Sequence, residues 1–221
     1  MAANVVTDAN DGIASNWSTG TTYEWNSVAN AGSGVHTDNN GGFGGVADTI
    51  RNNTVTACPA TGYGVWVFAP YRNVQVHQNN VSGCGVALGS FGQQVVVTPS
   101  FLTNTVAGMG SPNTVGFYGS TTLFGFGSTD ANARLVANQV QGFDYGAYIE
   151  SETGYAIDLT LHANDFLTNA TTGVYIAGPT AIVSGSANVG FNLDGKLLVT
   201  GNGAEYAFWK IGTWERAHTV P

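Results

Sequence analysis

A three-residue motif recurs along the chain: an asparagine, a polar residue, and then a bulky apolar residue. Its copies begin at Asn26, Asn53, Asn79, Asn104, Asn138 and Asn164. Successive copies are 27, 26, 25, 34 and 26 residues apart, and a degraded copy at Asn188 follows after 24 more. A period near 25 residues with one long interval is typical of repeat proteins, in which each unit buries its apolar face against its neighbours. The chain is therefore predicted to be a solenoid.

The residues around each motif alternate in polarity. The third residue before the asparagine is almost always apolar, and the residue two positions after it is Val or Phe, whereas the fourth residue before it and the residue directly after it are polar. This period of two predicts a strand on each side of a turn at the asparagine. A third strand follows, led by glycine, as in Gly64-Val-Trp-Val. Three short strands per repeat predict one coil of a parallel β-helix. Coils about 4.8 Å apart would let the asparagine amides bond along the stack.

Two of these repeats resemble a known family. Residues 73–88, Asn-Val-Gln-Val-His-Gln-Asn-Asn-Val-Ser-Gly-Cys-Gly-Val-Ala-Leu, and residues 155–176 are similar to the repeat of the pectate-lyase-like superfamily, which includes polygalacturonases, polysaccharide epimerases and phage tailspikes. The resemblance spans roughly residues 26 to 193. It implies an all-β, single-stranded, right-handed parallel β-helix of about seven coils, with a saccharide groove formed by loops beside the glycine-led strand.

The motif divides the chain into three parts. Residues 1–25 carry only a hint of it at Asn4, and we expect an irregular lead-in that covers the first coil, because a bare terminal coil exposes strand edges and core. The β-helix is expected to span residues 26–200. Residues 201–221, rich in aromatics, are expected to be a C-terminal cap or a subunit-contact segment; the resemblance to tailspikes implies a homotrimer for the second alternative.

Composition excludes some functions. The net charge is -8 with only six Lys and Arg, which argues against nucleic-acid binding. No apolar run approaches the roughly 20 residues of a membrane span. The N-terminus lacks the charged and apolar regions of a signal peptide, so no signal peptide is predicted in this chain. The resemblance implies an extracellular or virion-surface location and a polysaccharide partner.

The glycine-led strands predict a surface column of aromatic residues. Counting two residues from each leading glycine gives the outward positions His36, Trp66, Ala87, Tyr118, Tyr148 and Tyr175. Aromatic rings stack on the apolar faces of sugar rings, and exposed apolar patches mark interaction sites. We therefore predict that His36, Trp66, Tyr118, Tyr148 and Tyr175 bind carbohydrate. Burial of these rings under loops or against another subunit remains the alternative.

Three carboxylates near this column are candidate catalytic groups. Glu150 falls two positions beyond Tyr148, Glu152 follows it, and Asp130 ends the long loop of the preceding coil. A glycosidase needs two carboxylates about 5–9.5 Å apart. The alternative is a set of solvated or Ca²⁺-binding acids. An enzyme, if this is one, would be a glycoside hydrolase or a polysaccharide lyase, although the polygalacturonase motifs are missing and no cation falls on the column. No cofactor is indicated by a motif.

Three further features carry smaller predictions. His77 and His162 share a column three coils apart, about 14 Å, so we expect surface histidines rather than a metal site. Cys58 and Cys84 both follow a ladder asparagine by five residues and come within disulfide reach, but parallel positions suit the bond poorly, so stacked free thiols are expected. The long interval holds a loop at 120–130 that we interpret as a lid or groove wall; the alternative is that it packs on its own coil.

Overall fold

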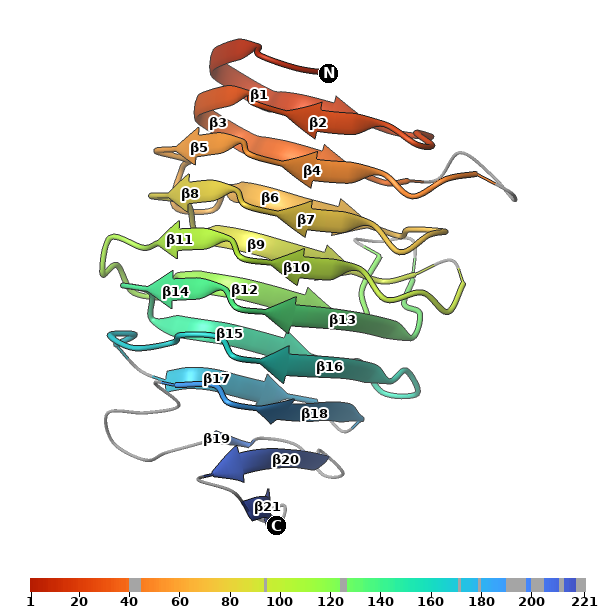
Figure 1. The fold of residues 1–221 in the computed structure, drawn as a ribbon, viewed down its shortest axis with the longest axis vertical. Coiled ribbons are helices and arrows are strands. Elements are labelled where there is room, and N and C mark those ends of the chain that lie inside the picture. Colours follow the sequence, from red (N-terminus) through yellow and green to blue (C-terminus); the bar gives the residue numbers. More distant parts are fainter. Residues whose placement is uncertain are drawn as a thin grey trace.

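The chain winds into a stack of β-coils (Figure 1). The computed structural model describes residues 1–39, 45–93, 95–123, 127–170, 172–178, 180–189, 198–199, 205–210 and 213–217. Within these residues the protein is an all-β parallel β-solenoid of about seven coils with no helix. The predicted fold is confirmed.

Two sheets run along the stack. The nine-stranded sheet comprises β2 (Thr22–Glu24), β4 (Thr49–Arg51), β7 (Gln75–His77), β10 (Ser100–Leu102), β13 (Ala131–Val136), β16 (Ile157–His162), β18 (Ala181–Ser186), β20 (Glu205–Lys210) and β21 (Thr213–Ala217). The 12-stranded sheet comprises β1 (Val5–Ser15), β3 (Ser27–Thr37), β5 (Thr54–Thr56), β6 (Tyr63–Phe68), β8 (Asn80–Ser82), β9 (Val86–Phe91), β11 (Thr105–Ala107), β12 (Val115–Ser120), β14 (Gln139–Gln141), β15 (Tyr145–Glu150), β17 (Thr172–Ala177) and β19 (Leu198–Val199). Neighbouring strands are parallel, apart from the antiparallel pair β20–β21.

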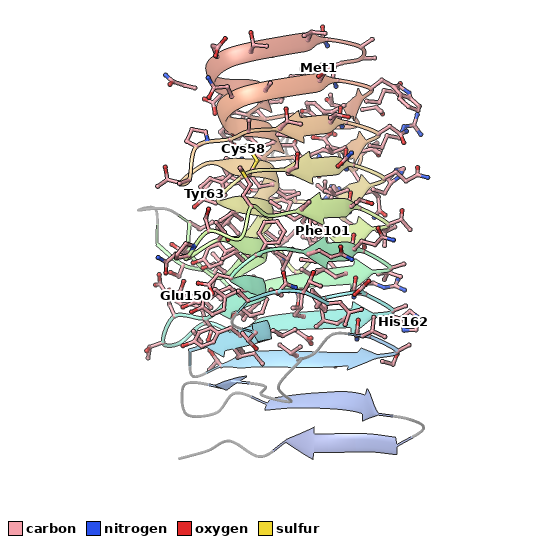
Figure 2. The ribbon with its side chains drawn as sticks, turned by 90° about the vertical axis from the view of Figure 1, so that its left-hand side faces the viewer. Met1, Cys58, Tyr63, Phe101, Glu150 and His162 are labelled. Carbon is pink, nitrogen blue, oxygen red and sulfur yellow. A yellow bond between two sulfur atoms is a disulfide. The ribbon has the colours of Figure 1, made fainter. Side chains whose placement is uncertain are left out.

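The core is built from columns of identical or similar residues. The apolar residue two positions after the ladder asparagine is buried in the six coils from Asn26 to Asn164, as at Val55, Val81 and Val140. The residue three positions before it forms a second column, in which Phe101 lies inside the stack against Phe117 with ring centroids 5.1 Å apart (Figure 2). Each such side chain contributes about 1.5–3 kcal/mol on burial. The period-two pattern therefore predicted the inward faces correctly.

The asparagine ladder is continuous from Asn4 to Asn188. In each coil the side-chain amide donates to Oδ1 of the asparagine in the next coil, at 2.8 to 3.0 Å. The residue before each asparagine is left-handed, with φ between 52° and 58°, as at Trp25 and Ala137. This bend carries the chain from one sheet to the other and turns the asparagine inward. Asn26, Asn53, Asn79, Asn104, Asn138 and Asn164 are all buried, so the ladder satisfies amides that water does not reach.

The first 25 residues are more regular than expected. β1 pairs with β3 in parallel from Val5 opposite Ser27 to Ser15 opposite Thr37, and Asn4 joins the ladder. The expected irregular lead-in is therefore a coil in its own right. The polarity pattern of β1 is hard to recognise in the sequence because β1 is at the end of the stack, where no further coil covers it. Ile13 is the only side chain of β1 that is buried. At the other end β20 and β21 close the nine-stranded sheet; the rest of the tail lies outside the described residues.

The two cysteines form a disulfide, so the expectation of free thiols is wrong. Cys58 and Cys84 are bonded, with their Cα atoms 4.4 Å apart (Figure 2). Each follows a left-handed residue, Ala57 or Gly83, beyond the end of a short strand. Both cysteines therefore lie outside the paired strands. Their side chains do not follow the inward and outward alternation of a strand, which would hold stacked residues parallel to each other.

Candidate functional site

The aromatic column follows the register of the 12-stranded sheet, with one correction. His36 pairs with Trp66, which pairs with Gly89, followed by Tyr118, Tyr148 and Tyr175. Ala87, predicted for the third coil, points into the core and is completely buried. The error arose because most of the other leading glycines are the second residue of their strand, whereas Gly85 comes directly before β9. Counting from Gly85 therefore starts two residues too early. Phe91 fills the space at Gly89, since a Cβ there would lie 2.8 Å from its ring.

These rings form a continuous strip across the coils. Tyr148 stacks on Tyr175 with centroids 4.8 Å apart, and Tyr118 lies 5.7 Å from Tyr148. Phe91 joins Tyr118 to Trp66, at 5.4 and 5.7 Å. Trp66, Tyr118, Tyr148 and Tyr175 are all partly exposed. These four rings are therefore accessible from solvent in the single chain, whereas Phe91 between them is completely buried.

His36 lies beneath this strip rather than on it. Its side chain is buried, with the ring centroid 4.3 Å from that of Trp66. Burial lowers the pKa of the His36 imidazole, and the charge of Asp11 opposes that shift in part. Ser33 Oγ lies 3.1 Å from His36 Nδ1 and accepts a hydrogen bond from Trp66 Nε1 at 2.8 Å. His36 thus orients Trp66.

A second column of tyrosines, which the sequence analysis missed, lies beside the first. Tyr63 and Tyr145 begin β6 and β15, and the register between them passes through Val86 and Val115. Three coil steps separate the two tyrosines, about 14 Å. Their signal in the sequence is a tyrosine directly before a leading glycine. Burial raises the pKa of both phenols.

The two columns enclose an open groove of about 430 Å³. It is lined by Tyr63, Val86, Asn113, Val115, Tyr118, Tyr145, Tyr148 and Glu150. Tyr63 and Glu150 project from the same side of the solenoid, and His162 lies on the opposite side (Figure 2). The valines form an apolar floor between tyrosine walls. The groove has the shape and chemistry of a small-molecule or oligomer binding site.

The three candidate carboxylates have different environments. Glu150 lines the groove and accepts a hydrogen bond from the phenol of Tyr118, whose pKa is raised by burial and by Glu150. Glu152 accepts a hydrogen bond from Ser128, and Asp130 accepts one at 2.7 Å from the backbone N–H of Ala156. Asp130 and Glu152 therefore connect loops of neighbouring coils, while Glu150 is the carboxylate that lines the groove.

The long loop packs against the preceding coil where the structure describes it. Leu123 is buried, and a Cβ at Gly92 would lie 2.4 Å from its side chain. Thr129 Oγ1 accepts a hydrogen bond at 2.6 Å from the backbone N–H of Gln93. The described parts of 120–130 are therefore held against the neighbouring coil, and these contacts show neither a lid nor packing confined to the loop's own coil. Phe124 and Phe126, part of that prediction, lie outside the described residues.

Basic residues in the described chain lie away from the groove. Arg51 pairs with Glu24 at 2.6 Å on the nine-stranded sheet, and Arg72 donates to the carbonyls of Gly45 and Tyr71. Arg134 lies on β13 of the nine-stranded sheet. The carboxyl group in the groove lining is that of Glu150, and Asp144 accepts a hydrogen bond from the backbone N–H of the lining residue Asn113 at 2.8 Å. The groove is therefore electronegative.

Fold and surface together define a class: a parallel β-helix with an aromatic groove on its longer sheet. A family model described as periplasmic copper-binding protein (NosD) matches residues 1–202, and the chain belongs to this family. That description places the family in the periplasm, which fits the expected location outside the cytoplasm and does not support a virion surface. No curated protein and no solved structure matches the chain. No helix in the described residues could cross a membrane.

The family description implies copper, so side chains able to bind that metal should lie close together. In the described part of the chain, no group of three or more His, Cys, Asp or Glu residues lies close enough together to hold a metal ion. His77 and His162 lie at the surface on strands three coils apart, as predicted. The sulfur donors Cys58, Cys84 and Met109 do converge on one pocket, but the disulfide occupies two of them. The described residues therefore do not form a copper site.

Proposed function

We propose that this chain is a glycan-binding β-helix that acts outside the cytoplasm. The observation that carries the proposal is the groove between Tyr63 and Tyr145, floored by valines and continuous with the aromatic strip. Such a surface suits a sugar chain, because pyranose rings offer apolar faces to aromatic rings and hydroxyls to the surrounding polar groups. The strip runs along the stack, so an extended oligosaccharide would lie across several coils.

The charge of the groove favours a neutral or amino-sugar glycan. Glu150 in the lining and Asp144 beside it would repel the carboxylates of a polyuronate, and the described cations lie elsewhere. An ammonium group near Glu150 would instead be attracted. Since the walls exclude part of the solvent, this discrimination would be stronger than in bulk water.

A glycan array followed by calorimetry with the best oligosaccharide tests the proposal. Tyr148→Ala removes the ring that contacts Tyr118, Tyr145 and Tyr175, and about tenfold weaker binding is expected, equivalent to about 1.4 kcal/mol. Tyr155→Ala is the matched control, because Tyr155 is exposed outside the groove. Absence of binding to every glycan, or equal losses in both variants, would reject the proposal.

The same protein samples separate this function from its alternatives. Release of reducing ends that disappears in Glu150→Gln would make the protein a glycoside hydrolase or lyase. A solution mass of three chains that falls to one chain in Tyr148→Ala would mean that the strip is a subunit contact within a structural assembly. Under our proposal, glycan binding is retained by a species whose mass does not depend on Tyr148.

A further inference from the structure

Glu150 places a carboxylate in the aromatic groove that no basic residue of the described chain pairs with. It lines the groove together with Tyr118, Tyr145 and Tyr148. Tyr118 donates its phenol to Oε2 of Glu150, and among the described residues no other side chain donates to this carboxylate. The salt bridge formed within the described residues lies on the nine-stranded sheet and does not involve Glu150. The second oxygen, Oε1, is therefore available to a ligand in the groove.

Tyr145 and Tyr148 form an aromatic corner beside this carboxylate. Their rings are nearly perpendicular, at 84°, with centroids 5.5 Å apart. Tyr118 adds a third ring, tilted by 47° relative to Tyr148 with its centroid 5.7 Å away. Tyr148 and Glu150 are two positions apart on β15, so they project from the same face of the sheet. Because the faces of aromatic rings are electron-rich, rings set at an angle around a cation attract it from several directions.

The phenols beside Glu150 stay neutral. Burial, followed by the hydrogen bond and the charge of Glu150, raises the pKa of the Tyr118 phenol. Burial and then the charge of Glu150 also raise the pKa of Tyr148. Since both shifts keep the phenols protonated in neutral solution, Glu150 is the side chain of the groove lining that carries charge. One carboxylate among neutral ring faces is the combination with which proteins recognise organic ammonium groups.

We propose that the groove selects glycans with free amines, that is, 2-amino-2-deoxy sugars that carry no N-acetyl group. This inference rests on the proposed function and names its substrate class. The ammonium group lies in the corner between Tyr145 and Tyr148 and donates a hydrogen bond to Oε1 of Glu150, while the apolar face of the sugar stacks on the neighbouring rings. An N-acetylated sugar presents an uncharged amide at the same place, so it gains neither the cation–π contact nor the charged hydrogen bond.

Calorimetric titration of the unmodified protein with two matched ligands tests the inference. The ligands are a glucosamine hexasaccharide and its fully N-acetylated counterpart, compared at about pH 6, where a free amine is protonated. The amine form is expected to bind about tenfold more tightly, because it alone makes the cation–π contact and the charged hydrogen bond. The ratio of the two affinities should fall towards one in Glu150→Gln. Tyr145→Leu should also lower it, whereas Tyr145→Phe, which keeps the ring face, should preserve it.

Glu152→Gln is the matched control, and circular dichroism checks that each variant keeps its fold. Glu152 follows Glu150 by two positions but bonds to Ser128 outside the groove lining, so this variant should retain the preference for the amine.

Three results would overturn the inference. Equal affinity of the unmodified protein for the two hexasaccharides would do so and leave the proposed function standing, since a glycan is still bound. A preference lost equally in Glu150→Gln and Glu152→Gln would assign it to the net charge of -8 rather than to the groove. Binding of neither hexasaccharide would also overturn it, and the glycan array then decides separately whether the proposed function holds.

Discussion

The phenol of Tyr118 on β12 donates a hydrogen bond to the carboxylate of Glu150 on β15. The two residues come from adjacent coils and are two positions apart along the sheet, since Tyr118 pairs with Tyr148 and Ser120 pairs with Glu150. The bond therefore crosses the strip diagonally and directs one side chain of the groove towards another. Glu150 is held in place before any ligand arrives, which favours binding because less side-chain freedom is lost.

Tyr118→Phe should loosen Glu150 without removing an aromatic ring. We expect a loss of about 1.5–3 kcal/mol in the free energy of unfolding, the range for a hydrogen bond to a charged group, measured by urea denaturation. Glycan affinity should also fall, because Glu150 would become mobile. Tyr155→Phe, outside the groove, serves as the control. Unchanged stability and affinity in Tyr118→Phe would contradict the role given to this bond.

A central member of the asparagine ladder should contribute more stability than the terminal one. Asn138 Oδ1 accepts from the backbone and side chain of Asn104, and its amide donates to Asn164 and to the carbonyl of Phe101. Asn138→Ala leaves several buried groups without partners, at about 1–3 kcal/mol for each.

Asn4→Ala is the matched comparison for Asn138→Ala. Asn4 lies at the exposed end of the ladder, where water can replace its contacts, so we expect a loss below about 1 kcal/mol. Denaturant unfolding of both variants measures the difference. Similar losses would mean that the ladder does not gain its stability from burial.

Burial of the Asp38 carboxyl predicts that stability depends on acidity. Burial raises the pKa of Asp38 from 3.8 to about 6. Since the pKa is higher in the folded state, the folded protein binds the proton more tightly. The stabilisation of the folded state by the proton on Asp38 is fully present below about pH 4 and is lost as the pH rises through about 6.

Asp38→Asn should remove this pH dependence. The variant is expected to be more stable than the unmodified chain at pH 7, and the difference should shrink on acidification to pH 4. Unfolding free energies at several pH values measure both curves. A difference that stays constant with pH would show that Asp38 titrates normally.

The sequence predicts the interior of this fold better than its surface. An inward residue such as Val55 or Phe101 obeys a period of two and recurs in every coil, because each coil must match its neighbours. Ala87 was misplaced because its strand was counted from Gly85. The ladder asparagines, being both buried and bonded, were identified correctly.

Surface residues are not constrained by stacking, so their pattern is weaker. Tyr63 and Tyr145 were missed because valines occupy the same position in the two coils between them. That interruption forms the floor of the groove. The disulfide was missed for a related reason: Cys58 and Cys84 lie beyond the strand ends, where alternation says nothing about side-chain direction.

Reduction of the Cys58–Cys84 disulfide should lower the free energy of unfolding. The bond joins residues 26 apart in sequence, and a cross-link of this span contributes about 3.5 kcal/mol by restricting the unfolded chain. Reduced and oxidised protein compared by urea unfolding should show this difference. Equal unfolding free energies in the two forms would contradict a stabilising role for the bond.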